Sequence, residues 1–222
     1  MTVLGEILPI AIGLAMLGVM PMIASVVLIS SQGGTGKAWL FTAGYLASIL
    51  VVTGLFVALG EGLDAEDEHA HSGMLRTVIQ FVVGVLLLAL AYRKFRSRGD
   101  TGSDGPAWLA KVDQLSTGRA FLLGAITGGA NPKNLALIPG AAVSIVAANI
   151  PPAQQALAVA VFAFIGSAGV ALPLIIPIVT GARSDQVLHS MREWLTRNSA
   201  VIMMVLLFIL GWVLIGRGLS GL

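Results

Sequence analysis

The 222-residue chain contains no cysteine and few charged residues. Without cysteine it forms neither disulfides nor thiolate metal sites, and a membrane thiol relay is excluded. Only 11% of its residues are charged, against about a quarter in soluble domains. The GxxxxGK[ST] loop that cradles nucleotide phosphates is missing as well, so any transport by this chain is not driven by an ATPase of its own. We expect a protein that is not an enzyme and that needs no cofactor.

Apolar residues, by contrast, make up 56% of the chain, and the mean hydropathy is +0.91. Long apolar runs recur along the whole length, and a bilayer core requires roughly 20 such residues per helix. We therefore predict an all-α integral membrane protein, with one polytopic domain over residues 1–222 and no soluble domain attached. The six predicted transmembrane helices cover about 7–30, 39–60, 74–92, 120–147, 153–180 and 198–216.

Basic residues divide unequally between the two sides of these predicted spans. The loops of one side hold ten of the 13 lysines and arginines: Lys37, Arg93, Lys94, Arg96, Arg98, Lys111, Arg119, Arg183, Arg192 and Arg197. The other side holds Arg76 and Arg217, and Lys133 lies within a span. By the positive-inside rule the ten face the cytoplasm, which places both termini outside the bacterial inner membrane. The same loops account for the pI near 9.3, so no nucleic-acid partner is expected.

Two stretches half a chain apart match in their glycines and in one proline. In GLAMLGVMPMIASVVL and GAITGGANPKNLALIP, the corresponding pairs are Gly13 and Gly124, Gly18 and Gly129, and Pro21 and Pro132. Each half holds three predicted spans, so the second half is inverted in the membrane relative to the first. Inverted repeats with broken helices in corresponding positions are typical of transporters with a midplane site. We predict two inverted three-helix repeats, about 1–92 and 120–222, joined by a cytoplasmic loop over about 93–119, with the first and fourth helices broken at their prolines.

The fourth predicted span carries the polar sequence NPKN. As one straight helix this span would measure about 42 Å, against a bilayer core of about 30 Å, so we expect a break at Pro132. Asn131 and Asn134 can bond the backbone groups that a break frees. Lys133 and the N–H groups of the following half-helix would form a positive spot at membrane depth, suited to a carboxylate, phosphate or sulfate. Alternatively, Lys133 bonds the carbonyls freed at Pro21 and Pro132 and touches no substrate.

Other segments carry weaker indications. The acidic segment over about 61–72 contains His69 and His71 and could bind a divalent cation, although such runs are usually solvated loops. Pro173 and Pro177 are expected to kink the fifth span. Two cytoplasmic segments have apolar residues at helical spacing and are interpreted as amphipathic surface helices or as loop helices packed on the bundle: Trp108, Leu109, Val112 and Leu115, then Val187, Leu188, Met191, Trp194 and Leu195. Close helix contacts are expected at Gly124, Gly128, Gly129 and Gly166.

The NPKN motif in a fourth span, a proline-bearing first span and six predicted helices resemble the lysine exporter (LysE) superfamily. Within it, the chain is most similar to the GAP/Sap family, the glycopeptidolipid- or sulfolipid-addressing proteins of actinobacteria, over nearly its whole length. The ending VLHSMREWLTRNSAVIMMVLLFILGWVLIGRGL is similar to that family's usual ending, an amphipathic segment, a polar step and a last span. The resemblance implies a membrane protein that exports, or helps to export, surface glycolipids.

The resemblance also implies a set of site residues. The family motif maps onto Asn131, Pro132, Lys133 and Asn134. Family members often have a small or polar residue before the first-span proline, whereas Met20 precedes Pro21 here, which leaves Ser25 as the nearest hydroxyl. The predicted substrate-binding residues are therefore Asn131, Pro132, Lys133, Asn134, Pro21 and Ser25.

From these observations we predict an exporter of an amphiphilic or anionic small molecule, with a cell-surface glycolipid as one candidate. One alternative is a non-transporting membrane accessory protein that assists a separate lipid exporter. Another is a divalent-cation exporter, for which His69 and His71 are the motive. The expected partners are a membrane lipid or small-molecule substrate, and either a second copy in a homodimer or a lipid-export machinery.

Overall fold

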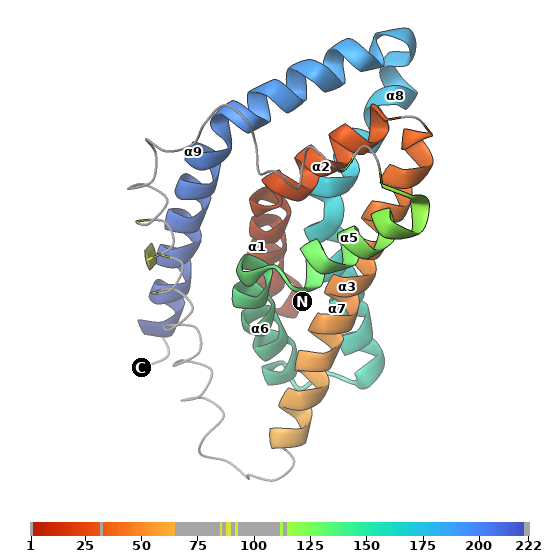
Figure 1. Cartoon of the computed structure of the whole chain (residues 1–222). Helices are drawn as coiled ribbons and strands as arrows, with labels where there is room; N and C mark the ends of the chain where they lie inside the picture. The colour runs from red at the N-terminus through yellow and green to blue at the C-terminus, as the bar shows by residue number, and fades with distance from the viewer. Residues whose placement is uncertain are drawn as a thin grey trace.

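The computed structural model describes residues 2–31, 33–64 and 115–219, together with positions 85, 88, 89, 92 and 112. Most of the third predicted span, most of the predicted loop over 93–119 and the acidic segment beyond residue 64 lie outside the described residues. The regular elements of the described ranges are all helices (Figure 1): α1 (Thr2–Leu17), α2 (Val19–Ile29), α3 (Gly34–Asp64), α5 (Thr117–Gly129), α6 (Pro132–Ala147), α7 (Pro152–Ala171), α8 (Ile175–Thr180) and α9 (Ser184–Leu219), with 3-10 turns η3 (Leu172–Leu174) and η4 (Gly181–Arg183) on either side of α8.

Two stretches of the described chain are helical, long and apolar enough to cross a membrane, Gly34–Gly60 and Pro152–Thr180. Helices α1 and α2 make a third if they form one span, since they are bent by 52° at a short break. Large apolar side chains lie exposed on the outside of these helices, as expected where a protein faces lipid: Val51, Leu55, Leu59, Leu157, Phe164, Ile178 and Val179. The all-helical membrane character is confirmed, while the six-span inverted-repeat arrangement stays a prediction.

Helices α3 and α5 pack with their backbones in contact. A Cβ added at Gly124 would overlap the main chain of Phe41, and a Cβ added at Gly44 would overlap the main chain of Phe121. Gly128 makes a similar approach to α3 one turn further along α5. Small residues let membrane helices come this close, so the predicted close contacts at Gly124 and Gly128 are confirmed. This contact, called the α3–α5 seam below, fixes α5 against α3. Helix α5 is the first half of the predicted fourth span, and α3 contains the predicted second span.

Helix α7 packs against α1 in the same manner. A Cβ at Gly169 would overlap the main chain of Ala15, and one at Gly166 would press on the side chain of Leu14. Shortly afterwards the helix gives way to η3, which contains Pro173, before continuing as α8. The predicted irregularity of the fifth span is therefore present. The contacts with α7 lie near the C-terminal end of α1, shortly before its break.

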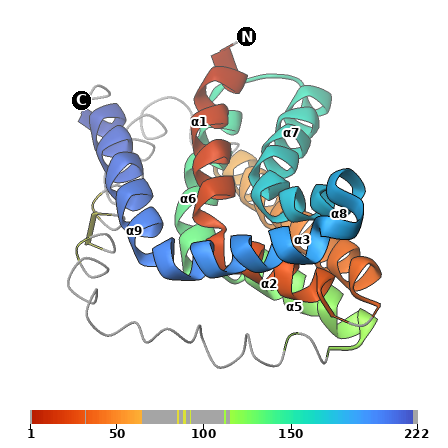
Figure 2. The same ribbon diagram turned by 90° about the horizontal axis from the view of Figure 1, so that it is seen from above.

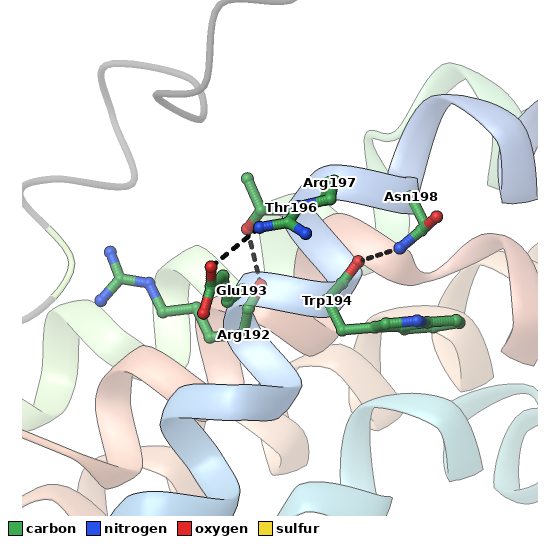
Figure 3. A network of polar contacts seen from close by, with 6 residues as sticks. All are labelled: Arg192, Glu193, Trp194, Thr196, Arg197 and Asn198. Atoms are coloured by element: carbon green, nitrogen blue, oxygen red, sulfur yellow. Dashed lines mark hydrogen bonds and ion pairs between the residues drawn. The ribbon is translucent and has the colours of Figure 1, made fainter.

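Helix α9 has two limbs. Figure 1 shows the first limb running across one end of the bundle from α8 and the second descending to the C-terminus, and Figure 2 shows the first limb passing along α2. The limbs meet at a cluster of side chains that bond the carbonyl one turn back (Figure 3): Thr196 Oγ1 donates to Arg192 O and Asn198 Nδ2 to Trp194 O, each at 2.8 Å. Such bonds often bend helices. They account for the bend at the predicted polar step.

The first limb of α9 buries only part of the apolar face predicted for it. Leu188 and Leu195 are buried, and Met191 packs partly against the core. Val187 and Trp194, which were expected on the same face, are exposed. They lie on the flank of the buried stripe because successive helical residues are separated by about 100°.

Candidate functional site

The break between α5 and α6 is formed by the NPKN sequence. Asn131 has an extended backbone and is the N-cap of α6, where its Oδ1 accepts a hydrogen bond from the Lys133 N–H at 3.2 Å. Pro132 follows as the first helical residue, a position where no intrahelical N–H bond is lost and a fixed φ is suitable. The predicted break at Pro132 is present, and the proline starts the second half-helix rather than interrupting a continuous one.

Asn134 closes the other side of this break. Its side chain is buried, and its amide donates to the Gly128 carbonyl at 2.7 Å and to the Thr127 carbonyl at 3.4 Å. Both carbonyls belong to the last turn of α5, where intrahelical donors run out. The same amide donates to the hydroxyl of Tyr45 at 3.2 Å. One buried side chain therefore joins α3, α5 and α6.

The break between α1 and α2 is built without a polar cap. Gly18 is the N-cap of α2 and makes no side-chain capping bond, while its carbonyl accepts the Met22 N–H at 2.8 Å. A Cβ added at Gly18 would lie 3.2 Å from the Ala15 carbonyl oxygen, 3.7 Å from the Tyr45 hydroxyl and 3.7 Å from Val170. The chain turns here at a glycine that is enclosed by the core.

The predicted break in the first span is present: the chain bends by 52° between α1 and α2, just before the proline. Pro21 lies in the first turn of α2, three residues beyond the turn at Gly18. A proline is tolerated there because the first-turn N–H groups have no intrahelical acceptor in any case. The break falls at the glycine of the matching pair, and the proline follows it.

Tyr45 lies between the two breaks and was not among the predicted site residues. Its side chain is completely buried, and its hydroxyl lies beside Gly18 of one break and Asn134 of the other. One signal was available: Tyr45 is one of two tyrosines in the chain, it stands in an apolar predicted span, and a buried phenol usually has a hydrogen-bond partner.

The predicted substrate-binding residues divide between the two breaks. Asn131, Pro132, Lys133 and Asn134 form the α5/α6 break, with Pro132 exposed, Asn131 and Lys133 half-buried and Asn134 buried. Pro21 and Ser25 lie on α2 and are both buried, and the Ser25 hydroxyl has no hydrogen-bond partner among the described residues. Substrate binding by these residues stays a prediction.

The positive character of the α5/α6 break comes chiefly from Lys133. Pro132 has no N–H, the Lys133 N–H is bonded to the Asn131 side chain, and the Leu135 N–H is bonded to the Asn131 carbonyl at 3.0 Å. The first turn of α6 therefore offers fewer amides to an anion than the sequence led us to expect. The charged ammonium and the dipole of α6 remain.

The metal-binding alternative concerns residues beyond the described ones. Within the described ranges, no group of three or more histidine, aspartate or glutamate side chains is placed to hold a metal ion. His69 and His71 lie outside those ranges, so cation binding by the acidic segment stays a prediction.

Comparison with known proteins places the chain in one family. The family model described as Sap, sulfolipid-1-addressing protein, matches residues 7–220 and so includes both breaks and Tyr45. No curated protein and no solved structure matches the chain. The relation to the wider lysine exporter superfamily stays a prediction. Because the family model covers nearly the whole chain, this protein belongs to the Sap (sulfolipid-1-addressing protein) family.

Proposed function

We propose that this protein exports an amphiphile with an anionic head group, such as a cell-surface glycolipid, across the inner membrane. Its family indicates a lipid-related membrane role. The observation that carries the finer proposal is the position of Lys133, a half-buried cation at the helix break where the apolar helix α6 begins. Ionisable residues at membrane depth are rare and usually belong to a substrate or ion pathway.

The surroundings of Lys133 suit an amphiphile rather than a small polar solute. Leu122 and Ile126 of α5 and Leu135 of α6 are exposed apolar side chains on the two helices that flank the break. A lipid whose head group bonds Lys133 can lay its acyl chains along this apolar surface. The hydrogen bond from the Lys133 N–H to Asn131 fixes the backbone from which the ammonium extends.

The proposal includes the predicted topology: six spans in two inverted repeats, with both termini outside and the basic loops in the cytoplasm. Corresponding breaks in the two repeats would place Lys133 near the middle of the bilayer, where transporters of this architecture bind substrate. The two breaks support this arrangement because both fall inside the segments whose glycines and prolines match, one at Gly18 and the other at Asn131.

The test uses liposomes that contain purified protein and a fluorescent lipid with a phosphate or sulfate head group. We expect the wild-type protein to move this probe between leaflets faster than a matched zwitterionic probe. Lys133→Met should fold normally and reduce the rate at least about tenfold. The anionic head group loses its bond to the ammonium, a loss of roughly 1.4 kcal/mol or more. Lys133→Arg should keep part of the rate, since the charge survives while the geometry changes.

The matched control is Lys37→Met, which removes the chain's lysine at the start of α3, and it should leave the rate unchanged. A well-folded Lys133→Met variant with normal transport would exclude Lys133 as the head-group site. If the wild-type protein binds the anionic probe through Lys133 but moves no lipid, the chain is the accessory protein of the alternative hypothesis and not an exporter.

A further inference from the structure

One side chain lies beside both helix breaks. The Tyr45 hydroxyl accepts a hydrogen bond from Asn134 at 3.2 Å, and it stands 3.7 Å from the position that a Cβ would take at Gly18. Tyr45 is completely buried. In a low-dielectric interior a hydrogen bond to a buried phenol is stronger than in water, and breaking it without replacement is unfavourable. The same hydroxyl therefore bonds one break directly and lies close to the other.

The backbone of Tyr45 is fixed to the α3–α5 seam. A Cβ at Gly128 would come within 2.8 Å of the Tyr45 carbonyl, and Ser48 Oγ donates to that carbonyl at 2.8 Å. Tyr45 must consequently move with α3 and α5 as one body. Its ring extends from that body to two other parts of the bundle, the turn at Gly18 and the start of α6.

The neighbouring groups leave little room for one break to change alone. Val170 of α7 lies as close to the Gly18 position as the Tyr45 hydroxyl does. Rotation of α6 that withdraws Asn134 removes the bond to the hydroxyl. Straightening or further bending at Gly18 changes the space that the phenol ring occupies. Either movement alters the position or the bonding of the same oxygen atom.

We propose that Tyr45 is a positioning residue that couples the two breaks, so that bending at Gly18 and repacking at Asn134 occur together. The purpose of such coupling rests on the proposed transport function, in which both repeats must change shape in one cycle. The coupling itself is a property of the protein without substrate. By reciprocity, a perturbation at either break must then be felt at the other to the same extent.

The test uses the absence of native cysteine to report on each break separately. Met20→Cys places a half-buried reporter beside the first break, and Ala130→Cys places an exposed reporter between α5 and α6. The rate of reaction with a small maleimide is measured for each, with and without Tyr45→Phe. The phenylalanine keeps the ring and removes the hydroxyl. We expect reaction rates about fivefold higher at both positions, the factor that corresponds to one ordinary hydrogen bond.

Tyr92→Phe is the matched control, because it removes the only other tyrosine hydroxyl, which is exposed. It should change neither rate. An increase confined to Ala130→Cys would show that Tyr45 merely supports Asn134, and unchanged rates at both positions would show that the hydroxyl couples nothing. Either outcome overturns the proposal.

A second measurement starts from the other break and does not depend on how well Tyr45→Phe folds. Gly18→Val puts a larger side chain between the Tyr45 hydroxyl and Val170, which each lie 3.7 Å from the Cβ position, and coupling predicts a changed rate at Ala130→Cys. No change there contradicts the proposal. These labelling rates require no substrate, so a protein that moves no lipid but shows the coupling would refute the proposed function alone. Normal lipid movement without coupling would refute only this inference.

Discussion

The two helix breaks differ in how the chain satisfies them. The α5/α6 break has its own polar side chains: Asn131 caps the start of α6, and Asn134 bonds the last carbonyls of α5. The α1/α2 break has a glycine, Gly18, as the N-cap of α2 and no side-chain cap. Its polar neighbour is Tyr45, which belongs to another helix.

This difference separates two ways of bending a helix in an apolar environment. At Asn131 and Asn134 the bend is held by directional bonds that persist whatever packs around them. At Gly18 no side chain caps the bend, and the adjoining turn of α1 is held by packing, through the close approach of Ala15 to Gly169 of α7. Substitution of Asn131 or Asn134 at the α5/α6 break should therefore lower the free energy of unfolding more than substitution of Gly18 at the α1/α2 break.

Asn134→Leu should have the largest effect. It leaves the Gly128 carbonyl buried without its donor and the Tyr45 hydroxyl without its partner, and each orphaned group is unfavourable by about 1–3 kcal/mol in general. Membrane helix contacts lie at the low end of such values, so we expect a loss of about 2–3 kcal/mol in the free energy of unfolding. Unfolding of the purified protein in denaturant measures it. Gln154→Leu, at an exposed amide on α7, is the control, and equal stability of the two variants would contradict the assigned role of Asn134.

Asn131→Ala should have an intermediate effect. It removes the oxygen that accepts the Lys133 N–H, and loss of an N-cap typically destabilises a helix by about 1 kcal/mol. Asn131→Ser keeps a capping oxygen and should restore most of the loss, since serine caps nearly as well as asparagine. The same unfolding measurement distinguishes them. If the serine variant is no more stable than the alanine variant, the amide acts through something other than the cap.

Gly18→Ala should have the smallest effect on stability. The φ of Gly18 is −73°, which alanine adopts readily, and the added methyl group asks the Ala15 carbonyl to shift by only a few tenths of an ångström. The lower chain entropy of alanine offsets part of this strain, so we expect a change within about 0.5 kcal/mol. A loss as large as that of Asn134→Leu would mean that the first break depends on glycine itself, and the contrast between the breaks would fail.

Local sequence features predicted the second break well and the first break less well. The sequence NPKN contains a cap, a first-turn proline and a second amide within four residues, so that break could be predicted from local chemistry. In the first span the proline predicted a break, and the chain turns at Gly18, in the turn before Pro21, where a proline disturbs a helix. The position of Pro21 does not show that the turn falls at a buried glycine without a side-chain cap.

The contacts between helices were less accessible to sequence reasoning. The bond between Asn134 and Tyr45 joins residues that are 89 positions apart, and no local pattern pairs them. Glycines at 124 and 128 predicted close packing, but not which helix would be the neighbour. Spacing along a helix defines a face, whereas the partner of that face is decided by the packing of the whole bundle.

The α3–α5 seam also has a consequence for biosynthesis. Gly44 and Gly124, which face each other across it through Phe121 and Phe41, are separated by about eighty residues of chain. At a translation rate of about 5–20 residues per second, the residues of α5 are synthesised roughly 4 to 16 seconds after those of α3. During that interval the surface around Gly44 is covered by lipid or by the insertion machinery. A side chain at Gly124 would hinder this late pairing, so its effect should appear first in the yield of assembled protein.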